Sequence, residues 1–452
     1  MSLILPPKKT GDAASLFLTS FDPSDLPGSS IDPLGFERGY LFLADKILPG
    51  FTNVANYPRY LSMLCAGTHL AEASLSDPPR IQYEKRLRCV LRLERFWAIA
   101  NVLAERANLD EELPTGGIRG VSYARKQADR IADRKLKKIS ADFELLSRQQ
   151  PYGVVGIYAS NADGMRLIDR KSFGLTPDLG ERLAKDFLTS SQIPKSLQKA
   201  IRGDGDVRRS VLTQWGLRCH ISNPLFKIEK ECIREATLRN PVRARMLSAI
   251  QEMAFDEEME EQACFNKLVK PLGKSESNRD LLETTKTILA YEQCYQVASL
   301  AFERMLWLCK NLPAAALSES EVAKEPILNQ VCNLLPKVTA EFCSLLDQGA
   351  TEGFRSGLER LSDVRSFLEE AVLSCDSTNK LTQVIIERHI DIQKGKFDRG
   401  RRKMPWVEKT RNKISLTMTR VGGLKTEALK PDDIRPHPYR LRTACSFLEA
   451  TV

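Results

Sequence analysis

The 452-residue chain is too long for one ordinary core and is expected to form three or four domains or subdomains. Hydrophobic residues make up 42% of the chain, which excludes global disorder, and the formal net charge of +9 favours an anionic partner. None of the eleven cysteines forms a Cys-x-x-Cys pair, so reduced, buried thiols are expected. Without a run of about 18 apolar residues or a signal peptide, the chain is predicted to be cytoplasmic and to make no contact with a membrane.

Residues 1–113 are predicted to form an N-terminal helical domain. After an irregular lead-in, Asp32 and Pro33 favour a helix that ends near Ile47. A second helix is expected from about Tyr57, and apolar residues at helical spacing predict one long helix over 79–108.

Three short strings in this region carry a resemblance. They are Asp32-Pro33-Leu34-Gly35, Leu48-Pro49-Gly50-Phe51-Thr52-Asn53 and Arg59-Tyr60, with a weaker match at Arg388-His389, Gln393-Lys394-Gly395-Lys396, Trp406 and His437-Pro438-Tyr439-Arg440. Together they resemble an uncharacterised bacterial family of hypothetical proteins that are often encoded near phage-defence genes such as helicases and nucleases. The resemblance implies a role in antiphage defence and assigns no catalytic residue. By its residues alone, the first region predicts a turn between helices that Arg59 fixes by pairing with Asp32 or Glu37; a ligand or partner site is the alternative.

Residues 114–190 are predicted to form a winged-helix-like module. A basic run opens it, and Asp169 to Gly174 suit a small wing or turn. Thr176 and Pro177 suit the N-cap and first turn of the next helix. Cations on such a module would contact phosphates, although a run of charge is also typical of a solvated helix face. The run from Arg119 to Lys138 holds eight cations: Arg119, Arg125, Lys126, Arg130, Arg134, Lys135, Lys137 and Lys138.

Residues 191–280 are predicted to form a helical middle region, and residues 281–393 a helical bundle. The clearest periodicity of the chain, from Ile288 to Cys309, predicts one helix with a continuous buried stripe. Further helices are expected over 322–347, 353–375 and 378–393.

Residues 394–452 are predicted to form a basic C-terminal tail. Nine cations lie between Lys394 and Lys413, with Trp406 among them, a combination that suits phosphate contacts and base stacking. The alternative is a solvated loop whose Trp406 packs on the bundle. Residues 414–418 alternate like a strand that pairs with a short partner, and a small helix is expected over 441–448.

No linear catalytic signature is present: four scattered histidines, no phosphate-binding loop and no nucleophile elbow. The sequence therefore predicts a mainly α-helical, multi-subdomain protein without cofactor or metal, and favours a non-catalytic subunit over an enzyme. The expected partners are nucleic acid, with DNA favoured, and the protein subunits of an antiphage defence complex. A metal-dependent nuclease or other DNA-modifying enzyme, whose site leaves weak linear traces, and a protein–protein scaffold stay open as alternatives. The predicted nucleic-acid-binding residues are Arg119, Arg125, Lys126, Arg130, Arg134, Arg166, Arg170, Lys171, Lys394, Lys396, Arg399, Arg401, Arg402, Lys403 and Trp406.

Overall fold

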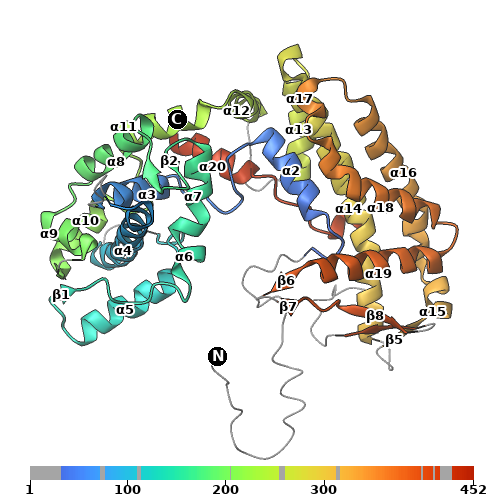
Figure 1. Cartoon of the computed structure of the whole chain (residues 1–452), viewed down its shortest axis with the longest axis horizontal. Coiled ribbons are helices and arrows are strands. Elements are labelled where there is room, and N and C mark those ends of the chain that lie inside the picture. The colour runs from blue at the N-terminus through green and yellow to red at the C-terminus, as the bar shows by residue number, and fades with distance from the viewer. Residues whose placement is uncertain are drawn as a thin grey trace, which may run out of the picture. The chain divides into compact units, whose positions relative to one another are not determined.

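The computed structural model describes residues 32–71, 77–108, 114–203, 205–253, 260–311, 316–398, 401–410, 413–417 and 430–451. The side chains of Glu261, Phe397, Asp398 and Arg401 lie outside this description. The prediction of a mainly α-helical protein is confirmed, with nineteen α-helices and nine short strands in these ranges (Figure 1). The chain divides into two compact units: unit 1 holds residues 1–43 and 275–437, and unit 2 holds residues 44–274 and 438–452.

Unit 2 is organised around two helices, α3 (Arg59–Leu70) and α4 (Pro79–Ala107). Both expected helices are therefore present. Helices α8 and α7 pack on α3, while α10 and α5 pack on α4. At the centre, Trp97 of α4 lies edge-on to Tyr60 of α3, with ring centroids 4.9 Å apart. The other elements of unit 2 are β1 (Lys138–Ile139), α5 (Val121–Asp133), α6 (Gln149–Tyr152), α7 (Val154–Gly164), β2 (Ile168–Asp169), β3 (Gly174–Leu175), α8 (Leu179–Ser190), α9 (Lys195–Arg202), β4 (Val207–Arg208), α10 (Arg209–Arg218), α11 (Lys227–Leu238), α12 (Pro241–Met253), α13 (Glu261–Leu272) and α20 (Leu441–Thr451).

The segment 114–190 contains a short hairpin where a wing was predicted. Strands β2 and β3 pair antiparallel, with Ile168 opposite Leu175. Asp169 holds the turn, because its carboxylate accepts hydrogen bonds from the backbone N–H and the hydroxyl of Ser172. The helix after it begins at Leu179 and not at Pro177, but the Thr176 hydroxyl still caps it by accepting the Gly180 N–H at 3.1 Å. The assignment of this segment as a winged helix stays a prediction.

Three helices of unit 2 end in the same way, with a long polar residue in the left-handed conformation. At the end of α5, the Lys135 N–H donates to Ala132 O and the Leu136 N–H donates to Ile131 O, which is the Schellman arrangement. Lys135 has φ +49°, at the position where glycine is usual. The same bonds and positive φ recur at Arg166 after α7 and at Gln192 after α8.

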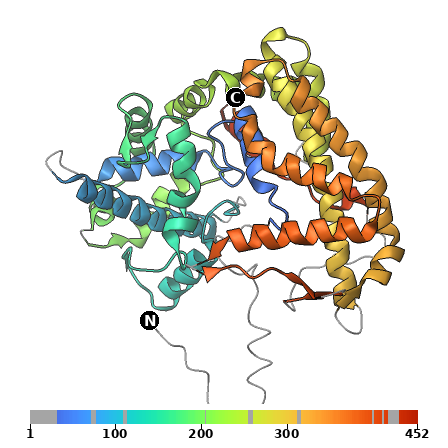
Figure 2. The same ribbon diagram turned by 45° about the vertical axis from the view of Figure 1, so that its right-hand side comes forward.

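Unit 1 is a helical bundle built on α14 (Arg279–Asn311), which confirms the predicted helix with a buried stripe. Helix α16 (Pro326–Gln348) runs along α14, and α18 (Ser362–Leu373) and α19 (Thr378–Gly395) complete the bundle (Figures 1 and 2). The other elements are η2 (Glu276–Asn278), β5 (Ala316–Ser318), α15 (Glu319–Lys324), α17 (Glu352–Arg355), η3 (Leu358–Leu361), β6 (Phe397–Asp398), β7 (Arg401–Arg402), β8 (Val407–Thr410), β9 (Lys413–Leu416) and η4 (Pro431–Asp433). Helix α2 (Glu37–Ile47) continues from unit 1 into unit 2.

Two of the predicted bundle helices are interrupted. The helix expected over 322–347 breaks between α15 and α16, because Pro326 forces Glu325 into an extended conformation with ψ 116°. The helix expected over 353–375 breaks at Gly357, whose φ of +81° is outside the helical range. The predicted strand near residue 414 is confirmed: β9 pairs antiparallel with both β5 and β8.

The first of the three strings, Asp32 to Gly35, contacts the weaker C-terminal match within unit 1. The Asp32 carboxylate accepts the N–H groups of Gly35 and Phe36, each at 2.8 Å, and so caps the entry to α2. From the weaker C-terminal match, Lys396 Nζ donates to Asp32 O at 2.6 Å, and His389 Nδ1 lies 3.1 Å from Pro33 O. Two strings that lie some 360 residues apart in the sequence are therefore in contact, and the contact stabilises the fold of unit 1.

Two buried arginines of unit 2, Arg59 and Arg243, hold the other two strings in place. The ion pair of Arg59 with Asp32 or Glu37 that the sequence predicts is not formed in the described part of the chain. Arg59 bonds Glu229, His220 O and Pro224 O, so the prediction that Arg59 pairs with Asp32 or Glu37 is wrong. The correct partner was 170 residues away, beyond any local pattern. Arg243 donates to Pro49 O at 2.7 Å and holds the Leu48–Asn53 turn.

Candidate nucleic-acid interface

The net positive charge of the chain lies in unit 2. This unit contains 40 Lys and Arg against 30 Asp and Glu, a formal net charge of +10, whereas unit 1 contains 27 against 28, a net charge of −1. The +9 of the whole sequence thus conceals one basic unit and one nearly neutral unit. An anionic partner is expected to be drawn to unit 2.

The pairing of β1 with β4 concentrates this charge. Lys138 lies opposite Arg208, and the Arg209 N–H donates to Lys137 O at 2.9 Å. The pairs Lys137-Lys138 and Arg208-Arg209, about 70 residues apart in sequence, thereby lie side by side just after the C-terminal end of α5. We call the resulting exposed cations the basic patch: Arg130, Arg134, Lys135, Lys137, Lys138, Arg208 and Arg209.

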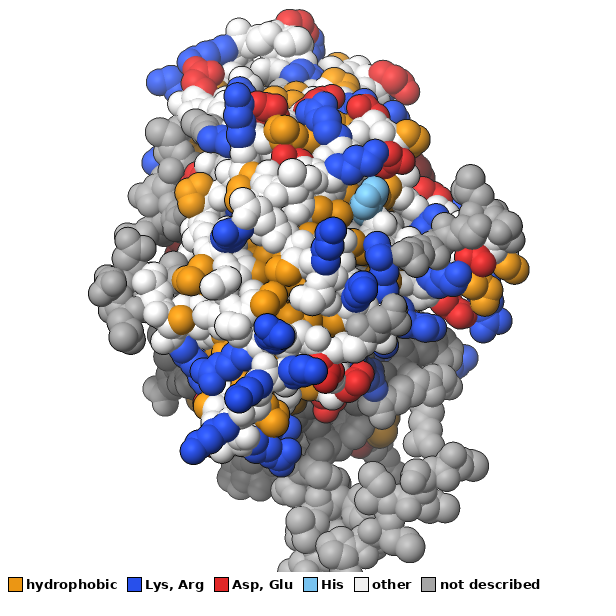
Figure 3. Space-filling view, turned by 90° about the vertical axis from the view of Figure 1, so that its left-hand side faces the viewer, with side chains coloured by type: hydrophobic (Ala, Val, Ile, Leu, Met, Phe, Trp, Pro, Cys, Tyr) orange, Lys and Arg blue, Asp and Glu red, His pale blue; other side chains and the backbone are white. Residues whose placement is uncertain are grey.

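No cation of the basic patch forms an ion pair with any residue in the described ranges. The acids nearest in sequence are Asp129, which pairs with Arg106 at 2.7 Å, and the exposed Asp133 and Asp206. Figure 3 shows the side of unit 2 on which α9 and β1 lie: Lys and Arg side chains spread across it and gather toward its lower end, with few Asp or Glu among them. The patch is therefore a solvated surface whose charge is not neutralised by the fold itself.

The other predicted residues at the start of the basic run have partners within unit 2. Arg119 is half-buried and donates to Tyr152 O at 3.3 Å. Arg125 pairs with Glu105 at 2.9 Å. The Lys126 ammonium lies 5.6 Å from the centre of the Tyr123 ring on its own helix. The structure thus divides the run. Arg119, Arg125 and Lys126 contact other residues of unit 2, whereas the cations from Arg130 to Lys138 belong to the basic patch.

The predicted residues near the hairpin form a separate group. Arg166, Arg170 and Lys171 are exposed, and Arg166 has a left-handed backbone. The hairpin and the α5–β1 end of the unit are well separated in Figure 1, so the structure does not bring these three residues to the basic patch.

The tail residues belong to unit 1, where several of them stabilise the fold. Lys396 Nζ donates to Asp32 O, and the backbone N–H of Trp406 donates to His389 Nε2 at 2.9 Å. The Trp406 ring packs against His389 and Phe302, which is the predicted alternative in which it covers the bundle. Lys394 and Arg402 are exposed and Lys403 is half-buried. Arg399 and the side chain of Arg401 lie outside the described residues.

Sequence reasoning missed Arg208 and Arg209. The signal that could have found them is that Lys137-Lys138-Ile139 and Val207-Arg208-Arg209 each place two cations beside one β-branched apolar residue. Ile139 and Val207 are the buried partners of the β1–β4 pair, so Lys138 and Arg208, which are next to them along the strands, are directed into solvent.

Away from the patch, the chemically unusual group of unit 2 is Glu94. Burial raises the pKa of its carboxyl to about 7, although Gln149 Nε2 and the Val154 N–H both donate to it at 2.7 Å. All of its contacts serve the fold, since it caps α7. In the described ranges, no group of three His, Cys, Asp or Glu side chains is placed to hold a metal ion, and no helix has the length and apolarity to cross a bilayer.

The chain matches no protein-family model, no curated protein and no solved structure.

Proposed function

We propose that the protein is a nucleic-acid-binding, non-catalytic subunit of a bacterial antiphage defence system, and that unit 2 binds the phosphate backbone through the basic patch. The observation that carries the nucleic-acid part is the set of seven exposed cations without ion-pair partners in the described ranges, on the unit that holds the net charge of +10. The resemblance of the three strings supports the defence context.

The geometry of the patch favours duplex DNA over single strands. Its cations come from a helix end and a two-stranded ribbon, and no aromatic side chain is among them. Without an aromatic platform for stacking, binding relies on phosphates and is insensitive to base sequence. Each phosphate contact releases counterions, so the affinity falls steeply with salt.

The test is a triple substitution, Lys137→Ala, Lys138→Ala and Arg208→Ala, with binding to labelled duplex DNA measured across a salt series. Loss of three phosphate contacts should reduce the slope of log K against log salt by roughly 3, because each contact contributes about 0.9. The affinity at low salt should fall roughly a hundredfold.

The matched control removes the same charge from unit 1, by Lys286→Ala, Lys310→Ala and Lys337→Ala, three exposed residues without ion pairs in the described part of the chain. This variant should bind as the wild type does. Equal losses in both variants would show a response to net charge alone, and equal binding in the patch variant and the wild type would remove the patch from the proposal.

The defence context has its own test. In a host that carries the chain with its neighbouring genes, the patch variant should lose protection against phage, while the unit 1 control should retain it. Full protection with the patch variant would separate DNA binding from the biological role. Cleavage of the labelled duplex by the purified chain with Mg²⁺ would instead favour the enzymatic alternative.

A further inference from the structure

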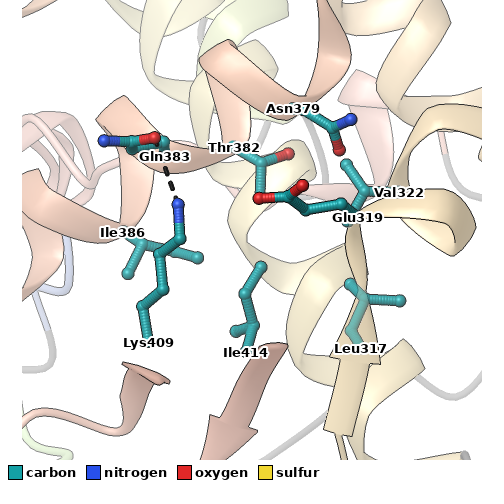
Figure 4. Close-up of a pocket in the computed structure, with 9 residues that line it drawn as sticks. All are labelled: Leu317, Glu319, Val322, Asn379, Thr382, Gln383, Ile386, Lys409 and Ile414. Atoms are coloured by element: carbon teal, nitrogen blue, oxygen red, sulfur yellow. Dashed lines mark hydrogen bonds between the residues drawn. The ribbon is translucent and has the colours of Figure 1, made fainter. Parts of the chain in front are cut away.

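A small pocket opens in unit 1, remote in sequence from the basic patch. It lies between α15, α19 and the β5–β9–β8 sheet (Figure 4). Apolar side chains form part of its wall: Leu317, Val322, Ile386 and Ile414. The remaining lining residues are polar and come from α15, α19 and β8.

Two oxygen atoms of the pocket lack a hydrogen-bond partner in the described structure. Thr382 is 2% exposed, and its Oγ1 atom is buried without a partner. Asn379 lies one turn earlier on α19, and its Oδ1 atom is also buried and unpartnered. A buried polar atom that makes no hydrogen bond costs free energy, so each of these positions favours a ligand that supplies a donor.

A carboxylate completes the set. Glu319, the first residue of α15, directs its side chain toward Thr382 and Asn379 in Figure 4. Within the described ranges, it forms neither an ion pair nor a side-chain hydrogen bond. The one cation of the lining, Lys409, is turned to Gln383, whose Oε1 atom accepts its hydrogen bond at 3.1 Å. Two buried oxygen atoms and the exposed carboxylate of Glu319 therefore line the pocket, and none of the three forms an ion pair or hydrogen bond with a side chain in the described ranges.

We propose that this pocket binds the ammonium group of a primary alkylamine, either a free amine or a lysine side chain. An ammonium group offers three donors, which matches the oxygen atoms of Thr382, Asn379 and Glu319. The apolar wall suits the methylene groups that precede the nitrogen. The cavity of about 10 Å³ has room for one water-sized group, which suits an ammonium group with its methylene groups at the mouth and excludes a sugar or a base.

The first experiment measures thermal unfolding of the full chain in propylamine hydrochloride, with sodium chloride at equal ionic strength as the reference. Propylamine should stabilise the protein saturably, and sodium chloride should not. Glu319→Gln and Thr382→Val should each weaken the apparent affinity about tenfold or more, because each removes one partner of a charged hydrogen bond. Thr382→Val keeps the side-chain shape, and both variants must unfold like the wild type without amine.

The matched control is Glu370→Gln, which removes an exposed carboxylate on α18, outside the pocket. It should leave the response to propylamine unchanged. Equal stabilisation by propylamine and sodium chloride, or an undiminished response in both pocket variants, would overturn the proposal and leave a pocket that holds water.

A second probe separates the two sources of the amine. A short lysine-containing peptide and its acetylated form are titrated in the same assay. Tighter binding of the lysine peptide than of propylamine, lost on acetylation, would assign the site to a protein partner. Equal or weaker binding of the peptide would assign it to a free amine.

Discussion

The two basic runs of the chain look alike in sequence and differ in the structure. Residues 119–138 hold eight cations and residues 394–413 hold nine. In unit 2 the second half of the first run stays in solvent and is extended by Arg208 and Arg209. In unit 1 the second run supplies structural contacts, such as Lys396 on Asp32 and Trp406 on His389.

The number of cations in a run therefore does not determine whether they are available to a partner. Their availability depends on whether another segment of the fold supplies hydrogen-bond acceptors to them. The carbonyl oxygen and the carboxylate of Asp32 lie next to Lys396 of the tail, whereas the segment after α5 pairs with a strand that brings two more cations. Each unit also contains a buried titratable side chain, His389 in unit 1 and Glu94 in unit 2, and their pH dependence allows the stability of the two units to be compared by experiment.

The largest expected effect is the acid sensitivity of unit 1 through His389. Burial lowers the pKa of this histidine from 6.5 to about 4, so the unfolded chain takes up a proton at a higher pH than the folded chain. Stability should therefore fall by about 3 kcal/mol as the pH drops from about 6.5 to about 4. The free energy of unfolding at each pH is measured by urea unfolding, followed through the fluorescence of Trp406 in a variant whose other tryptophans are replaced by Phe. His389→Gln should flatten this part of the pH profile, and an identical profile in the variant would contradict the assignment.

Unit 2 should respond to pH in the opposite sense through Glu94. Its pKa is raised from 4.5 to about 7 by burial, so the folded chain holds a proton that the unfolded chain has already lost. Stability should fall by about 3 kcal/mol as the pH rises from about 4.5 to about 7. The readout is urea unfolding followed through Trp97, with Glu94→Gln as the variant in which the slope disappears. A wild-type profile that rises over this interval would show that other groups dominate unit 2.

A middle-sized effect separates structural cations from available ones. Lys396→Met removes the ammonium group from Asp32 and should destabilise unit 1 by about 2 kcal/mol, with DNA affinity unchanged. Lys394→Met, two residues earlier and exposed, is the control and should change stability by less than about 0.5 kcal/mol. Denaturant unfolding and DNA titration of the two variants decide the matter. Weaker DNA binding by the Lys396 variant would return that residue to the interface.

The smallest effect concerns Lys135, which has a left-handed backbone at the end of α5. Lys135→Gly should raise the free energy of unfolding by about 1 kcal/mol, because glycine adopts this conformation without steric cost. The same change should reduce the salt slope of DNA binding by about 0.9. Lys137→Gly, at a position without positive φ, should reduce the slope equally without stabilising the fold. A stabilised Lys135 variant with unchanged DNA binding would remove Lys135 from the patch.

Local patterns predicted much of the fold. The stripe from Ile288 to Cys309 and the long helix α4 follow from helical spacing, and the capping role of Thr176 follows from its position before a helix. The partner of Arg59 could not be predicted, because Glu229 is 170 residues away and no periodicity links them. The basic patch was only partly predicted for the same reason: five of its seven cations lie in one run, residues 130–138, whereas Arg208 and Arg209 join them through a pairing of two-residue strands.

Helix α20 closes unit 2: Phe447 packs edge-on against Phe51, with ring centroids 5.0 Å apart, and the Thr443 hydroxyl donates to Thr52 O. All of unit 1, by contrast, is encoded before residue 438. During synthesis the ribosome therefore finishes the unit that depends on residues 275–437 first, although most of unit 2 has emerged earlier. Until residues 441–451 are made, Phe51 lacks its contact with Phe447, so nascent unit 2 presents an apolar surface there that the finished chain covers.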